Sequence, residues 1–132
     1  MIRNRILFAG VLSLGLFCTQ CKKGPGVGGR ATIQGKVYEV VYDKKYLWKL
    51  DSGYSGNQTV NILFGTDLGV DGNQKTSYDG TYTFQYMRPG KYKLFTYSRS
   101  RKTNLPDSAV VRDVEITGNT QVLTLPDIRI VR

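Results

Sequence analysis

Apolar and polar residues alternate strictly in the centre of the chain. Tyr82, Phe84 and Tyr86 share one side of an extended backbone, and the residues between them are polar. A period of two is typical of a strand with one buried face. An Asp-Gly pair precedes this run, a Pro-Gly pair follows it, and the alternation resumes at Tyr92 and Leu94. Because both pairs favour turns, the pattern predicts two consecutive strands with those five side chains facing inward.

Shorter runs of the same kind predict five more strands. They are expected at residues 31–42, 59–65, 74–78, 108–117 and 120–131. In the first, Ile33 and Val37 face inward, and Gly35 between them permits a close backbone approach or a bulge. Pro126 lacks an N–H for the ladder, so we expect the last strand at a sheet edge or bulged there. About seven short strands, without an amphipathic helix, predict an all-β sandwich.

A longer motif extends through the central hairpin. From Thr76 to Leu94 the order is T-x-x-D-G-x-Y-x-F-x-x-x-x-P-G-x-Y-x-L. It resembles the central signature of carboxypeptidase regulatory-like domains, which are close to collagen-adhesin B-type repeats. The run from Ile33 to Val37 is similar to the opening strand of that family. The resemblance covers roughly residues 32–131 and implies a transthyretin-like sandwich. It implies no single function, because such modules serve as spacers, plugs and adhesive domains.

The first twenty residues have the pattern of a targeting segment. Arg3 and Arg5 precede an apolar run at 6–17 that is too short to cross a bilayer as a helix. Cys21 follows, which resembles a bacterial lipoprotein signal, with Cys18 as a second candidate. The resemblance implies a signal peptide at 1–20, acyl chains on Cys21 and attachment to a membrane through them. An ordinary secretory peptide is the alternative.

The residues after Cys21 predict where the folded domain begins. Residues 21–30 are rich in Gly and Lys, and we expect a flexible tether there, followed by one domain at 31–132. The Cys-Lys-Lys start is similar to lipoproteins of the Bacteroidota, which implies an outer-membrane address in the cell envelope. No acidic residue occurs before Glu39, so the periplasmic leaflet and the cell surface both stay open.

Charge and composition exclude several kinds of chemistry. The net charge is +9, and removing Arg3 and Arg5 leaves 9 − 2 = +7. In an exported protein this favours anionic lipid or acidic polysaccharide over nucleic acid, or simply a solvated basic face. The chain has no His, which excludes His-dependent nucleophilic catalysis and the commonest zinc ligation. We therefore expect no enzymatic activity, cofactor or metal.

Residues 43–58 show no clean hydrophobic period, and we expect a long loop or a loose hairpin there. Aromatic residues cluster in and beside this stretch. The candidate ligand-binding residues are Tyr42, Tyr46, Trp48 and Tyr54, interleaved with Lys44, Lys45 and Lys49, together with Phe95 and Tyr97 on the strand face opposite Leu94. Aromatic side chains with polar tips are favoured at recognition surfaces. Alternatively, the loop folds back and Trp48 caps an open end of the sandwich. The hypothesis is a lipid-anchored accessory module that binds a glycan or an envelope protein; the alternative is a structural module whose Pro126 strand pairs with a partner.

Overall fold

The computed structural model describes residues 23–99 and 108–132. Every regular element in these residues is a strand, and no helix is present among them. The strands are β1 (Val27–Tyr42), β2 (Lys49–Tyr54), β3 (Thr59–Phe64), β4 (Gly72–Lys75), β5 (Thr81–Met87), β6 (Gly90–Ser98), β7 (Ser108–Ile116), β8 (Val122–Thr124) and β9 (Ile128–Val131). The predicted all-β fold class is confirmed. The described residues form nine strands instead of about seven, because 43–58 contains β2 and Pro126 separates β8 from β9.

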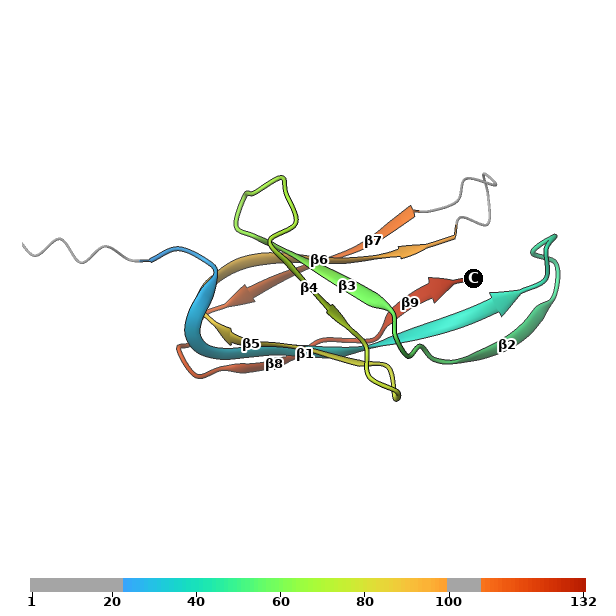
Figure 1. The fold of residues 1–132 in the computed structure, drawn as a ribbon, viewed down its shortest axis with the longest axis horizontal. Coiled ribbons are helices and arrows are strands. Elements are labelled where there is room, and N and C mark those ends of the chain that lie inside the picture. Colours follow the sequence, from blue (N-terminus) through green and yellow to red (C-terminus); the bar gives the residue numbers. More distant parts are fainter. Residues whose placement is uncertain (1–22, 100–107) are drawn as a thin grey trace, which may run out of the picture.

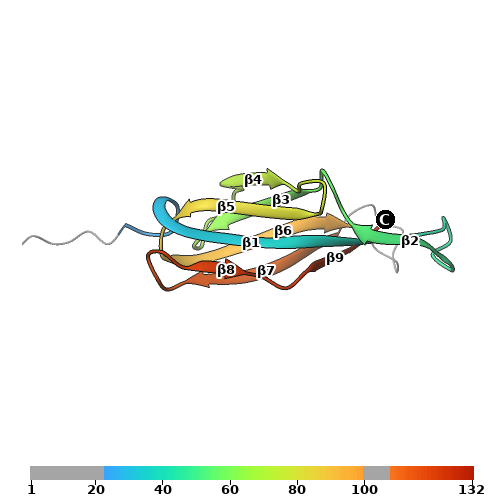
Figure 2. The same ribbon diagram turned by 90° about the horizontal axis from the view of Figure 1, so that it is seen from below.

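Two sheets stack to form a sandwich (Figure 1). One is antiparallel with the order β4-β3-β6-β7, and the other is built around β1. Ile33 of β1 pairs with Phe84 of β5 on one side and with Leu123 of β8 on the other. Further along, Glu39 pairs with β2 and with β9 in the same way. The long strand β1 is therefore the central member of its sheet along the whole molecule, as Figure 2 shows.

The core lies between the two sheets and follows the predicted alternation. The inner faces of both sheets contribute side chains to the core. The buried residues include Ile33, Val37, Val60, Ile62, Tyr82, Phe84, Tyr92 and Leu94. Gly35 fits the expected close approach, because a Cβ on it would lie only 2.5 Å from the Tyr82 hydroxyl oxygen. The absence of a side chain at this position thus allows the Tyr82 ring to lie close against β1.

Tyr86 does not face the core, so its predicted inward position was wrong. From Ile33↔Phe84 to Ala31↔Met87 the register advances by two residues on β1 and three on β5. The extra residue makes a bulge, with Tyr86 at a φ of 59° and its side chain 67% exposed. Met87 takes the inward place. A bulge shifts the alternation by one position, which periodicity alone cannot reveal.

The prediction of a flexible tether at residues 21–30 is wrong for the second half of that range. β1 begins at Val27, and Gly26 is buried. The Gly26 N–H donates to the Tyr92 hydroxyl at 2.8 Å, and its carbonyl accepts from the Arg88 N–H at 2.8 Å. The segment is held because these partners satisfy its backbone, although it has few side chains to bury. Cys21 and the predicted signal peptide lie outside the described residues.

The Pro126 strand lies at an edge, as predicted. Among the described strands, β8 and β9 pair only with β1, and Pro126 falls between them. Each is short, with three and four residues respectively. In the part of the chain that is described, no helix has the length and apolarity needed to cross a bilayer.

Candidate functional site

The stretch 43–58 forms a hairpin, one of its two predicted structures. β1 and β2 pair antiparallel from Tyr38↔Tyr54 to Val41↔Asp51, with an irregularity at Tyr42. The hairpin projects from one end of the sandwich (Figure 2). Both of its faces are therefore open to solvent near the tip, which explains why the stretch lacks a clean hydrophobic period.

Asp43 organises the turn at the tip of this hairpin. Its Oδ1 accepts hydrogen bonds from the N–H groups of Leu47 at 2.7 Å and Trp48 at 3.0 Å. Its backbone N–H donates to the Trp48 carbonyl at 2.9 Å. The hydrogen bond from Trp48, with others from the turn backbone, lowers the pKa of Asp43 below its usual value of 3.8. The carboxylate is therefore ionised at neutral pH and holds the turn in one conformation.

The tip exposes large apolar side chains that the turn keeps in place. Leu47, Trp48 and Leu50 are 69%, 72% and 66% exposed. Trp48 consequently does not cap the open end of the sandwich, and that alternative was wrong. The hydrogen bonds of the turn join the backbone N–H and C=O groups of Trp48 to Asp43, and the indole ring lies in solvent. Several large apolar side chains exposed within four residues of one another are typical of an interaction site.

Two adjoining hollows lie behind the tip and share Tyr42, Arg99 and Arg132. The larger, about 440 Å³, also contains Tyr97 from β6, and the smaller, about 200 Å³, contains Tyr46. The rings of Tyr42 and Tyr46 lie 6.4 Å apart at an angle of 46°. The structure therefore brings three of the six candidate aromatic residues together around two arginines.

The two arginines differ in their electrostatic surroundings. Arg132 forms an ion pair with Glu39 at 2.9 Å, and its Nη2 donates to the Gln58 side chain at 2.5 Å. Arg99 is fixed through its backbone N–H, which donates to the Val131 carbonyl at 2.9 Å. Its guanidinium forms no ion pair with any described residue, and it is exposed. The larger hollow therefore offers a guanidinium without an ion-pair partner among the described residues, next to aromatic rings, whereas the smaller hollow also contains Asp43.

The other candidate residues lie outside these hollows. Trp48 is at the tip. Tyr54 packs edge-on against Tyr38 at 5.4 Å and donates its hydroxyl to Asp127 at 3.0 Å. Phe95 is half-buried and contacts Tyr97 edge-on at 5.5 Å, so it orients Tyr97 instead of lining the hollow.

Sequence reasoning missed Gln58, Arg99 and Arg132. They come from segments far apart in the chain, and no local motif marks them. Parallel pairing of β9 with β1 places Arg132 beside Tyr42, whose N–H donates to the Arg132 carbonyl at 2.9 Å. Recognising that the first and last strands are neighbours would have been the useful signal.

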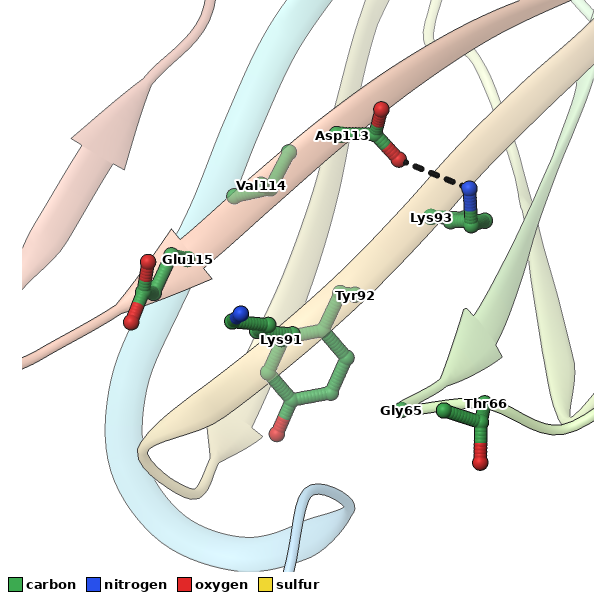
Figure 3. A pocket seen from close by; sticks show the side chains of 8 residues that line it. All are labelled: Gly65, Thr66, Lys91, Tyr92, Lys93, Asp113, Val114 and Glu115. Atoms are coloured by element: carbon green, nitrogen blue, oxygen red, sulfur yellow. Dashed lines mark ion pairs between the residues drawn. The ribbon is translucent and has the colours of Figure 1, made fainter.

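A larger hollow, about 520 Å³, lies near the outer face of β6 and β7 (Figure 3). Lys91 and Lys93 lie opposite Glu115 and Asp113 in register, and Lys93 forms an ion pair with Asp113 at 3.1 Å. These four charges cancel, and the pairs are exposed. The arrangement fits a solvated sheet surface better than a ligand site. Within the described chain, no three His, Cys, Asp or Glu side chains gather as metal ligands would.

No family model and no curated protein matches the chain. Among solved structures, it is similar to the crystal structure of a candidate carbohydrate-binding protein from Pseudomonas aeruginosa. The two are 13% identical with a TM-score of 0.47, and the match covers 81% of this chain and 91% of that one. At that identity the similarity defines no family, so the function has to follow from the site itself.

Proposed function

We propose that the protein is a non-catalytic binding module whose hairpin end holds an acidic glycan. One observation carries this proposal: Tyr42, Tyr46 and Tyr97 line adjoining hollows beside Arg99. Aromatic rings stack on the apolar faces of sugars, and a guanidinium matches a carboxylate through two parallel hydrogen bonds. A sugar acid presents both features on one ring. The exposed apolar tip around Trp48 would extend the contact along the chain of the glycan.

Charge supports an acidic ligand over a neutral one. Lys44, Lys45 and Lys49 are exposed around the tip, and none of them is part of an ion pair among the described residues. Uncompensated cations near a concave surface raise the rate at which anions reach it. The affinity should therefore fall as salt screens these charges.

The same proposal places the protein in the cell envelope. We infer acylation of Cys21 from the targeting pattern of residues 1–20, with the outer membrane as the address. Membership of the carboxypeptidase regulatory-like domains is likewise a proposal, supported by burial of the motif positions Tyr82, Phe84, Tyr92 and Leu94. The absence of His from the sequence supports a role without catalysis.

Edge pairing, the alternative function, receives less support. β8 and β9 are short and are interrupted by Pro126. Short edge strands and prolines are devices that discourage the addition of another strand.

Binding to a panel of uronic-acid-containing and neutral polysaccharides tests the proposal. Tyr97→Ala and Arg99→Gln should each weaken binding to the acidic members about tenfold, the loss typical of a central contact residue. Tyr78→Ala is the matched control, because Tyr78 is fully exposed and lies outside the hollows. Equal losses for Tyr78→Ala and Tyr97→Ala, or unchanged binding by both hollow variants, would contradict the proposal.

A further inference from the structure

The end of the sandwich opposite the hairpin carries a separate hollow of about 370 Å³. It lies where the described chain begins, and the turn after β5 and the connection before β8 close it. Lys23, Arg30 and Arg88 line it together with the backbone of Gly28 and Gly29. Figure 1 and Figure 2 show this end and the hairpin tip at opposite extremes of the molecule.

The charges in this hollow are all of one sign. Its lining contains three cations and no Asp or Glu. None of the three forms an ion pair with a described residue. This differs from the hollow on β6 and β7, where each lysine lies opposite an acid. Like charges held close together without counter-charges create a local positive potential that favours an anion.

Arg88 is the best-placed of the three to bind a ligand. Its guanidinium lies against the glycine backbone, since a Cβ on Gly26 would come within 2.6 Å of Nη2 and one on Gly28 within 3.9 Å of Nη1. Among the described residues, its buried Nε has no hydrogen-bond partner, and Nη2 has only a long contact of 3.4 Å to the Pro25 carbonyl. Leaving such donors unsatisfied costs free energy. The missing side chain at Gly26 leaves the space that the guanidinium occupies.

We propose that this hollow binds a phosphate group. Phosphate offers several oxygens to converging donors, and the fork of an arginine matches it with two hydrogen bonds. Arg88 and Arg30 supply guanidinium donors, and Lys23 adds a mobile charge. The group could come from a lipid headgroup or from a soluble phosphorylated compound. The hollow begins two residues after Cys21, so a headgroup would be close at hand if that cysteine is acylated.

The first test uses the full chain in micelles of a neutral detergent, with inorganic phosphate as the probe. The Arg88 side-chain N–H and the Gly28 and Gly29 amide signals should shift saturably by nuclear magnetic resonance at constant ionic strength. Arg30→Gln should weaken binding about tenfold, the factor expected when one charge-assisted hydrogen bond is lost. Lys75→Gln is the control, because Lys75 is an exposed lysine on β4 outside the hollow.

The second test distinguishes the two sources of phosphate. Micelles doped with phosphatidylglycerol should shift the same signals and compete with inorganic phosphate, whereas micelles of the neutral detergent alone serve as the reference. Competition supports a headgroup site, and phosphate binding without competition supports a soluble ligand. Absence of saturable shifts, or equal losses for Arg30→Gln and Lys75→Gln, would overturn the proposal. Glycan binding at the hairpin is measured separately and can fail independently.

Discussion

Gly35 and Tyr82 form a tight contact between β1 and β5, and adding one methyl group there should be costly. In Gly35→Ala the new Cβ would lie 2.5 Å from the Tyr82 oxygen and 2.8 Å from its Cζ. The ring cannot move away, because Tyr82 is 1% exposed and packs on Phe84 at 6.2 Å. Overpacking of this kind typically costs about 1–3 kcal/mol. The melting temperature should fall by about 4–8 °C for each kcal/mol.

The hydroxyl of Tyr82 makes the prediction sharper, because it has no hydrogen-bond partner among the described residues. Burial also raises the pKa of Tyr82 to about 12, so the group stays protonated at ordinary pH. Tyr82→Phe removes an unsatisfied polar atom and should stabilise the fold by about 1 kcal/mol. It also removes the atom nearest the Gly35 Cβ. The double variant should therefore recover part of the stability that Gly35→Ala loses. The sum of the two single effects on the free energy of unfolding and the effect of the double variant should differ by about 1 kcal/mol.

Urea unfolding of the two single variants and the double variant measures this coupling. Gly53→Ala on β2 is the matched control, since nothing lies within 4 Å of its Cβ; it should change the free energy of unfolding by less than about 0.5 kcal/mol. A cost for Gly35→Ala no larger than that of the control would refute the close approach. Destabilisation by Tyr82→Phe would show that the hydroxyl has a partner, such as a buried water.

Two further predictions concern the hairpin turn and the bulge. The fold lowers the pKa of Asp43. The free energy by which the ionised carboxylate stabilises the fold is therefore present above about pH 3.8, the usual Asp value. It is lost as the pH falls through the lower pKa of the folded state. In that acidic range the amide resonances of Leu47 and Trp48 should change together, because both N–H groups donate to Asp43. Asp43→Asn should remove this pH-dependent change. Resonances of the original protein that do not change with pH would argue against the hydrogen bonds of the turn. Tyr86→Gly should stabilise the fold by up to about 1 kcal/mol, because Tyr86 has a positive φ of 59°. Tyr78→Gly, at an exposed site with an ordinary φ, should not stabilise in the same urea titration, and equal effects would contradict the role of backbone strain.

Alternation predicted the sandwich well wherever one face of a strand is buried. Ile33, Val37, Tyr92 and Leu94 all point into the core as expected. Alternation did not predict the structure correctly where a strand has no buried face or where its alternation is interrupted. β2 has no core beneath it, and the bulge at Tyr86 shifts the phase of β5. The start of β1 was missed because its glycines are held by backbone hydrogen bonds instead of side-chain burial.

The candidate site could be predicted only where its residues are neighbours in sequence. Tyr42 and Tyr46 lie close together in the chain, and the aromatic clustering identified both. Tyr97 was found as an exposed aromatic residue, but its position beside Tyr42 depends on how the two sheets stack. Arg99 follows β6 directly, two residues after Tyr97, and no local pattern connects it with Tyr42.

β1 is one uninterrupted strand that joins the two ends of the molecule. Its part from residue 31 to residue 42 spans roughly 40 Å at about 3.3 Å per residue. Neighbouring strands flank it on both sides along this length. A force that pulled the two ends apart would load these lateral hydrogen bonds together in shear, instead of opening them one after another. If Cys21 is acylated as proposed, the domain would act as a stiff strut that keeps the hairpin at a constant distance from the membrane.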